Sequence, residues 1–298
     1  MAFQPVSHEP LYTARDLTPV GGFTDGIEGP GCDAQGYLYA VNFARQHTIG
    51  RVTPAGVADL FLELRGGSIG NGIRFNSEGH MFIADYINHN ILRVNMIACA
   101  HATTLEARNA AVDVFAHEAS MNQPNDIAIS ANDTLFASDP NWAESWGQIW
   151  RISSTGSVTL LETRMGTTNG IEVSPDERTL YVNETVQRNV WAYDLSPSGE
   201  ISNKRLLIKF DDYGMDGMRC DVAGNLYITR WGKGTVAKVS PQGQLLQEIP
   251  LTGSKCTNIA FGGPDGCTAY VTVADRGNIE TFRVETPGRE WQLAQRRR

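Results

Sequence analysis

The sequence predicts an all-β fold, a six-bladed β-propeller whose blades are four-stranded antiparallel sheets. Two observations predict it. A polar residue followed by an apolar strand, a turn and a second apolar strand recurs six times, and side chains in these strands alternate with a period of two. That period indicates strands with one buried face. The copies begin at intervals of 43, 54, 44, 47 and 41 residues, at Glu28, Asn71, Asn125, Asn169, Asp216 and Thr257.

Each copy continues into a third and a fourth strand. In the copy that starts at Asn125, we expect these strands at Ile149–Ile152 and Val158–Leu161, joined by a turn at Ser154–Gly156. The copy that starts at Asp216 repeats the pattern with strands at 235–239 and 245–249. Turns rich in Asp, Asn, Ser and Gly are typical of tight hairpins.

The two ends of the chain complete the ring. About 40 residues follow position 257, too few for a full blade and its ending, so we expect Tyr12–Thr18 to add the missing outer strand. The long second copy contains an Ala-rich insert near Cys99–Ala111, expected as a short helix or a surface loop. We predict a single propeller domain over residues 1–298, structured from roughly 12 to 286, with a flexible tail that ends in three arginines (296–298).

Composition limits the partners. Apolar residues make up 41% and charged residues 19% of the chain, as in soluble globular proteins. The net charge of −8 argues against a nucleic-acid partner. No stretch approaches the ~20 apolar residues of a membrane span, and residues 1–15 lack the pattern of a signal peptide. We expect a cytoplasmic monomer or weak oligomer. Five cysteines without C-x-x-C spacing indicate reduced thiols.

The blade pattern also places the polar residues that begin the copies. The innermost strand of each blade follows the central channel, so these six residues converge on one face of the ring. Asn and Asp also begin strands for purely local reasons. Two carboxylates that face each other across a channel, however, repel each other unless a cation lies between them. Glu28 and Asp216 would supply charge, and Asn125 and Asn169 neutral oxygens, to one hard divalent ion.

The identity of the metal stays open between Ca, Mn, Zn, Mg and Fe(II), which all accept oxygen ligands. The six histidines are scattered without ligand spacing, so a histidine-rich site is not supported.

Five short segments, in order and at blade spacing, carry a resemblance to a known family. They are E-G-P at Glu28, P-N-D around Asn125, N-G-I-x-x-S-P-D at Asn169, D-G-M at Asp216 and T-N-I-A-F-G-G at Thr257. From about residue 20 to 285 the chain resembles the senescence marker protein/gluconolactonase/regucalcin family. The resemblance implies a six-bladed propeller with one catalytic divalent metal, held by the residues matching Glu28, Asn125, Asn169 and Asp216. It also implies hydrolysis of aldonolactones or related lactones.

Four residues are expected to contact substrate. Some members of this family carry an arginine two residues before the P-N-D asparagine, where this chain has Gln123. Asn71 is one of the converging polar residues. Arg230 and Trp231 end a second strand on the same face, where the guanidinium would meet a substrate hydroxyl or carboxylate. The indole would stack on a sugar, together with Trp142 and Tyr86.

The predicted reaction is hydrolysis of an aldono- or aldarolactone to the open acid, with water as the nucleophile. Asp216 is the expected base, because it resembles the family's proposed base and the following Gly217 leaves its carboxylate room. Metal ligation lowers the basicity of a carboxylate, so Asp139 and Glu184 stay open as alternative bases.

Two other functions are also compatible with the fold: a binding propeller without catalysis, and a phosphotriesterase-like hydrolase at the same site. A G-x-S-x-G segment at 66–70 precedes a strand, whereas the serine-hydrolase motif requires a strand–turn–helix elbow.

Overall fold

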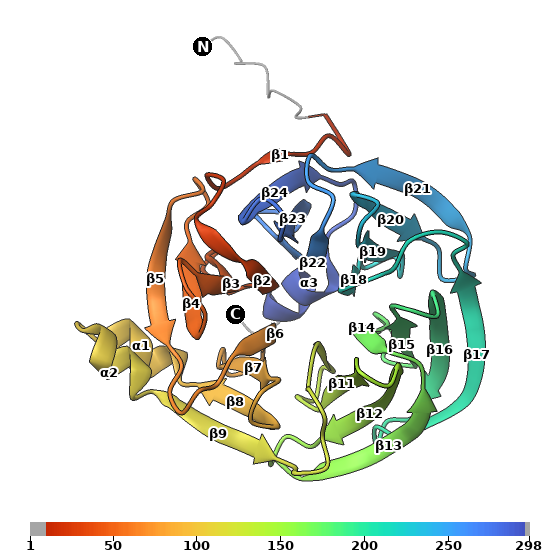
Figure 1. Cartoon of the computed structure of the whole chain (residues 1–298), viewed down its shortest axis with the longest axis horizontal. Helices are drawn as coiled ribbons and strands as arrows, with labels where there is room; N and C mark the ends of the chain where they lie inside the picture. Colours follow the sequence, from red (N-terminus) through yellow and green to blue (C-terminus); the bar gives the residue numbers. More distant parts are fainter. Residues whose placement is uncertain (1–9, 296–298) are drawn as a thin grey trace.

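Residues 10–295, which the computed structural model describes, form a ring of six antiparallel four-stranded sheets around a central channel (Figure 1). Each sheet runs outward from the channel in chain order, except that the last sheet takes its outer strand from the N-terminal part of the chain. The six-bladed propeller predicted from the repeat is therefore confirmed.

The strands of each blade follow from the inside outward. The inner strands are β2 (Phe23–Cys32), β6 (Gly70–Phe75), β10 (Ile127–Ile129), β14 (Thr168–Val173), β18 (Met218–Cys220) and β22 (Cys256–Gly262). The second strands are β3 (Leu38–Phe43), β7 (Met81–Asp85), β11 (Leu135–Asn141), β15 (Thr179–Glu184), β19 (Leu226–Arg230) and β23 (Thr268–Val273). The third strands are β4 (Thr48–Val52), β8 (Asn90–Val94), β12 (Trp146–Ile152), β16 (Asn189–Leu195), β20 (Thr235–Val239) and β24 (Asn278–Arg283). The outer strands are β5 (Ala58–Glu63), β9 (Val112–His117), β13 (Val158–Met165), β17 (Ile201–Lys209), β21 (Leu245–Pro250) and β1 (Arg15–Asp16).

The short strand β1 closes the ring. It pairs antiparallel with β24, with Arg15 opposite Thr281 and Asp16 opposite Glu280. The backbone N–H of Leu17 donates to Ile279 O over 2.8 Å and continues this contact. The predicted outer strand from the N-terminal part of the chain is confirmed, although it spans only Arg15–Asp16 of the expected residues 12–18. Closure satisfies backbone groups that an open ring would leave unpaired at its last blade.

The apolar core lies between neighbouring blades. Val41 and Ile49 of the first blade pack with Ile73 and Ile83 of the second, and all four are fully buried. Such clusters recur between the other blades, because each strand presents β-branched and aromatic side chains to the adjacent sheet. This packing holds the inner strands in place, and with them the polar residues at the channel.

Consecutive blades are also joined by backbone hydrogen bonds at the channel. The N–H of Gly72 donates to Asn125 O over 2.8 Å, and the N–H of Gly170 donates to Asp216 O over 3.1 Å. Each bond links the beginning of one inner strand to the polar residue that begins the next copy. The converging residues are thus tied to one another through the backbone.

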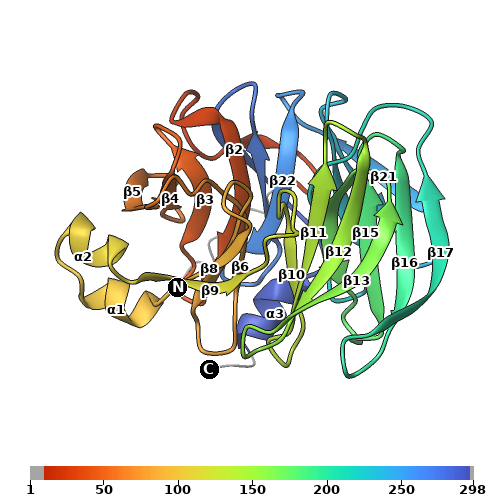
Figure 2. The same ribbon diagram turned by 60° about the horizontal axis from the view of Figure 1, so that its bottom comes forward.

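Three short helices complete the structure. The insert in the second blade forms α1 (Met96–His101) and α2 (Leu105–Asn109), with Asn95 and Thr104 as N-caps. The sequence did not predict the helix α3 (Arg289–Gln295). It lies at the end of the channel away from the face seen in Figure 1, as Figure 2 shows. The terminal arginines and residues 1–9 fall outside the described residues.

Helices of residues 10–295 are all too short or too polar to cross a membrane. The five cysteines, which lie within this range, form no disulfide.

Candidate active site

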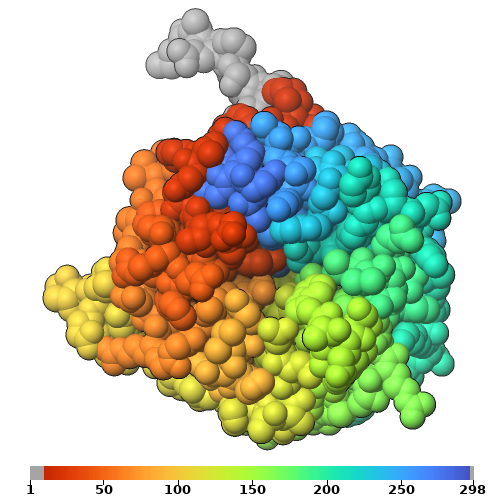
Figure 3. Space-filling model, viewed as in Figure 1, coloured from red at the N-terminus to blue at the C-terminus, as the bar shows by residue number. Residues whose placement is uncertain are grey.

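Two adjoining cavities open at the channel on the face shown in Figure 3, which is hollowed at its centre. The inner cavity has a volume of about 270 Å³, and its walls are Glu28, Asn71, Asn125, Trp142, Asn169, Thr185, Asp216 and Trp231. The outer cavity, of about 310 Å³, shares five of these residues and adds polar side chains that include Asp25, Asn42, Gln46 and Gln123. All four residues predicted to hold a metal therefore line one cavity.

Unpaired oxygen atoms distinguish these cavities. Among the residues that line them, the buried side-chain oxygens without a hydrogen-bond partner are Glu28 Oε1, Asn42 Oδ1, Asn71 Oδ1, Asn125 Oδ1 and Asn169 Oδ1. Each such acceptor costs free energy unless a donor or a cation reaches it. Several unpaired acceptors around these cavities indicate a binding site for a cation or for a ligand rich in hydrogen-bond donors.

A larger cavity of about 680 Å³ lies beside α1, between the first and second blades. Its partly buried carboxylate, Asp33, accepts hydrogen bonds from the Tyr39 hydroxyl and from the backbone N–H of Tyr37. No described side chain that lines it has an unpaired buried polar atom. The larger cavity therefore lacks the unsatisfied oxygens that mark the channel.

Glu28 is held so that one oxygen remains available. Its Oε2 accepts hydrogen bonds from the backbone N–H of Gly29 and from Asn258 Nδ2, the latter over 3.0 Å. Oε1 has no partner. A Cβ atom on Gly217 would lie 1.9 Å from Asn258 Cγ. We expected Gly217 to leave room for the carboxylate of Asp216, but the space beside it is taken by Asn258, the side chain that orients Glu28.

Asn169 is oriented in the same manner. Its Nδ2 donates to Thr185 Oγ1 over 3.1 Å, which leaves its Oδ1 without a partner. Thr185 lines the inner cavity but was missed in the sequence, because a threonine that follows a β-strand carries no distinguishing signal. The backbone of Asp216 is fixed as well: its carbonyl accepts from Asn183 Nδ2 over 2.7 Å.

The two carboxyl groups of the site are strongly perturbed. Burial raises the pKa of Glu28 to about 7, and the negative charge of Asp126 contributes to the increase. Burial, followed by the charge of Glu28, raises the pKa of Asp216 well above its usual range. Both shifts mean that a second negative charge is disfavoured at this position unless a cation compensates it.

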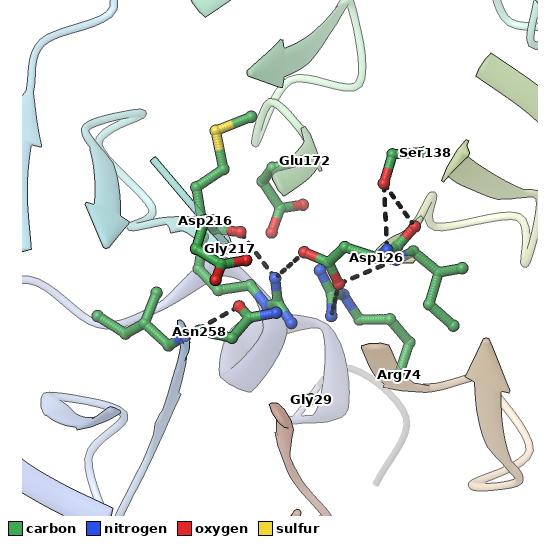
Figure 4. A network of polar contacts seen from close by, with 12 residues as sticks. Gly29, Arg74, Asp126, Ser138, Glu172, Asp216, Gly217 and Asn258 are labelled. Atoms are coloured by element: carbon green, nitrogen blue, oxygen red, sulfur yellow. Dashed lines mark hydrogen bonds and ion pairs between the residues drawn. The ribbon is translucent and has the colours of Figure 1, made fainter. Parts of the chain in front are cut away.

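Below these carboxyls, three acids and three arginines form buried or partly buried ion pairs in the channel. Figure 4 shows Arg74, Asp126 and Glu172 of this network. Arg219 Nη1 lies 3.0 Å from an oxygen of Asp126, and Arg289 Nη1 of α3 lies 3.3 Å from Glu172. The remaining members are Arg74 and Glu290. Arg289 also pairs with Glu177, so every arginine of this network has an acidic partner. Glu28 and Asp216 form no ion pair with a described cation.

Three of the predicted substrate-contacting residues line the cavities. Asn71 and Trp231 line both, and Gln123 lines the outer one. Arg230 lines neither. Its side chain is fully buried, donates to Asp212 over 2.6 Å and to Glu248 over 3.0 Å, and lies 3.8 Å from the ring centroid of Phe210.

The two alternative bases also lie outside both cavities. Asp139 accepts hydrogen bonds from the backbone of Asn122 and Gln123 and from the side chains of Gln148 and Trp150. Glu184 accepts from Gly166 N and from Asn189 Nδ2. Both carboxylates hold loops.

The ligand set is low in charge. Among residues 10–295, no group of three or more His, Cys, Asp or Glu side chains is arranged to hold a metal. The channel instead offers two carboxylates together with amide oxygens. Hard cations with flexible coordination accept this combination.

Two relatives of this chain are named as lactonases. The chain is 28% identical over 240 residues to a gluconolactonase of Zymomonas mobilis, which covers 73% of this chain and 64% of that protein. It is 31% identical over 153 residues to a pentonolactonase of Haloferax volcanii, which covers 50% of this chain and 53% of that protein. The chain thus spans between half and two thirds of the length of these relatives.

The fold is shared with solved structures. A calcium-binding protein, regucalcin, from Agrobacterium tumefaciens superposes with a TM-score of 0.74 at 20% identity, over 92% of this chain and 97% of that one. Residues 26–275 match the family described as the SMP-30/Gluconolactonase/LRE-like region. The ring of polar residues lies within this match, and the chain belongs to the SMP-30/gluconolactonase/LRE-like family.

Proposed function

We propose that this protein is a divalent-metal-dependent lactonase that hydrolyses a sugar-acid lactone to the open acid. The observation that carries the proposal is the set of unpaired oxygens around two uncompensated buried carboxyls in one cavity. The gluconolactonase and pentonolactonase relatives support the reaction class.

The residues present fit a divalent ion. Glu28 and Asp216 would hold it with two carboxylates, and Asn125 and Asn169 with the amide oxygens that have no other partner. Two positive charges would offset the two carboxylates, and Asn258 and Thr185 keep the ligand oxygens directed into the cavity. When bound, such an ion polarises the carbonyl of an ester or lactone. Calcium, manganese, zinc, magnesium and ferrous iron are all compatible with these donors.

Asp216 is positioned to move the proton. It lines the inner cavity, whereas Asp139 and Glu184 are engaged in holding loops. Asp216 takes a proton from water as the water oxygen bonds to the lactone carbonyl carbon. The ring C–O bond then breaks, and Asp216 returns the proton to the departing ring oxygen, which becomes a hydroxyl. The products are one carboxyl and one hydroxyl on an open chain.

The other residues of the cavity bind and orient. The indoles of Trp142 and Trp231 flank both cavities and offer flat apolar surfaces to a sugar ring. The amides of Asn71 and Gln123 can both donate to and accept from hydroxyl groups. Because α3 lies across the far end of the channel, substrate and product pass through the face shown in Figure 3.

A panel of aldonolactones tests the proposal, with release of acid followed by a pH indicator and an organophosphate triester included as the alternative substrate. We expect lactone hydrolysis that is lost in Asp216→Asn. Turnover of the triester without any lactone would identify a phosphotriesterase-like enzyme. Binding of sugars without turnover would identify a binding propeller.

A further inference from the structure

We infer that the site selects uncharged polyhydroxy lactones and disfavours lactones that carry a second anionic group, with Asp25 as a residue that sets this preference. The inference rests on the proposed lactonase function and specifies its substrate class. It follows from the charges that line the two cavities and from the orientation of Arg230 and Lys255 beside Trp231.

The walls of the two cavities contain no Lys, Arg or His side chain among the described residues. Three of the lining residues are acids: Glu28, Asp216 and Asp25. A divalent ion would offset the first two, so the net charge that a substrate meets is that of Asp25. A carboxylate, sulfonate or phosphate on the substrate would therefore find no cationic partner in the cavity walls and one like charge.

Asp25 lies at the outer cavity, away from the position where a lactone carbonyl would react. It is exposed and lines the outer cavity but not the inner one. It makes no ion pair or hydrogen bond with another described side chain. Its negative charge is therefore free to act on the distant end of a bound sugar.

The arginine next to Trp231 in the sequence is turned away from the cavity. Arg230 directly precedes Trp231, which lines both cavities, but its guanidinium is turned to Asp212 and Glu248 and is fully buried. Lys255 is the other cation close to this wall. It is exposed, with Nζ 5.8 Å from the ring centroid of Trp231, and it lines neither cavity.

Apart from Asp25 and Glu28, the polar groups that line the outer cavity are neutral. Asn42, Asn71, Gln46 and Gln123 present carboxamides there. A carboxamide donates and accepts hydrogen bonds without charge, which matches the hydroxyl groups of an aldonolactone. The walls thus recognise hydroxyls. They contain no cation that would offset the free-energy cost of removing water from a second anionic group.

The test compares kcat/KM for neutral and anionic lactones under low and high salt. The neutral probes are glucono-1,5-lactone and xylono-1,4-lactone, and the anionic probes are glucaro-1,4-lactone and 6-phosphoglucono-1,5-lactone. We expect the wild-type protein to prefer the neutral probes at least 10-fold. Asp25→Asn should raise the anionic-to-neutral ratio roughly 3- to 10-fold, and Asp25→Lys should raise it further. Added salt should reduce these differences, because it screens exposed charges.

Asp211→Asn is the matched control. Asp211 is an exposed acid in the segment between β17 and β18 and lines neither cavity, so its neutralisation should leave the ratio unchanged. Equal or faster turnover of the anionic probes by the wild-type protein, or a ratio unmoved by both Asp25 variants, would overturn the charge selection alone. If the wild-type protein hydrolyses neither the neutral nor the anionic lactones, the proposed function is overturned as well.

Discussion

Asn258 donates a side-chain N–H to Glu28 over 3.0 Å, although the two residues are 230 positions apart in the sequence. The bond joins the last blade to the first at the channel and occupies one oxygen of Glu28, while the other oxygen faces no partner. Asn258 itself has room for this contact only because Gly217 has no side chain.

We therefore predict that Gly217→Ala and Asn258→Ala have the same consequence. A Cβ atom at position 217 would displace the amide of Asn258, and either change would release Glu28 from its orientation. Affinity for the divalent ion should fall about 10- to 100-fold, as on loss of other groups that orient metal ligands. Isothermal titration calorimetry on chelated protein measures the loss.

Gly22→Ala is the control for the added methyl group. A Cβ atom there would meet only Pro19 O, at an ordinary contact distance of 3.6 Å. If Gly217→Ala binds metal as tightly as Gly22→Ala, the role assigned to Asn258 is wrong.

The raised pKa of Glu28 predicts a stability that depends on pH in the metal-free protein. The folded protein holds the Glu28 proton up to about pH 7, whereas an ordinary glutamate releases it near 4.5. The folded state therefore binds more protons than the unfolded state in this window, and its stability falls as pH rises. The loss between pH 4.5 and 7 should be on the order of 3 kcal/mol.

Urea unfolding of chelated protein at several pH values measures this loss. Other carboxyls with lowered pKa values, such as Asp265, act in the opposite direction, so the difference from Glu28→Gln isolates the effect. The wild-type profile should fall more steeply than that of the variant. Parallel profiles would show that Glu28 ionises normally in the folded protein.

Arg230→Ala should lower stability and leave substrate affinity nearly unchanged. The substitution leaves a cavity beside Phe210 and removes one of the two cations paired with Glu248, the other being Lys233. Removal of this fully buried side chain should lower the free energy of unfolding by roughly 2 to 3 kcal/mol, mainly through the cavity that it leaves. Thermal unfolding measures the loss, and KM for the lactones should stay within about twofold. A KM that rises more than tenfold in the folded variant would restore Arg230 as a substrate contact.

Asp139→Asn and Asp216→Asn should differ in their pH–rate profiles at saturating metal. Asp139 accepts hydrogen bonds from four residues, two in the loop at Asn122 and Gln123 and two in β12. Its variant should therefore be less stable but keep the acidic limb of the profile. Asp216→Asn should lose turnover. Glu184→Gln serves as a second loop control. Near-normal turnover of Asp216→Asn with an unshifted acidic limb would exclude Asp216 as the base.

The repeat in the sequence was sufficient to predict the propeller and the ring of polar residues. A period-two pattern indicates which face of a strand is buried. Copies that begin every 41 to 54 residues indicate how many blades the chain forms and where each one starts. The closure by β1 could also be predicted, because the last copy lacks an outer strand.

Contacts between distant segments could not be predicted in this way. Arg230 ends β19, and its position in the strand does not show that Asp212 and Glu248 turn its guanidinium away from the cavity. The helix α3 depends on Arg289, whose partner Glu172 lies 117 residues earlier. The role of Thr185 likewise depends on Asn169 in the neighbouring strand.

Stepwise return of a divalent ion to the exhaustively chelated protein, with lactone hydrolysis followed at each step, tests whether this cavity is a metal-dependent active site. The chelated protein should be inactive, and turnover should rise in proportion to added metal until one equivalent per chain is bound. Asp216→Asn should stay inactive throughout the titration. Full activity after exhaustive chelation would contradict the metal site. So would a metal-dependent rise in turnover in Asp216→Asn.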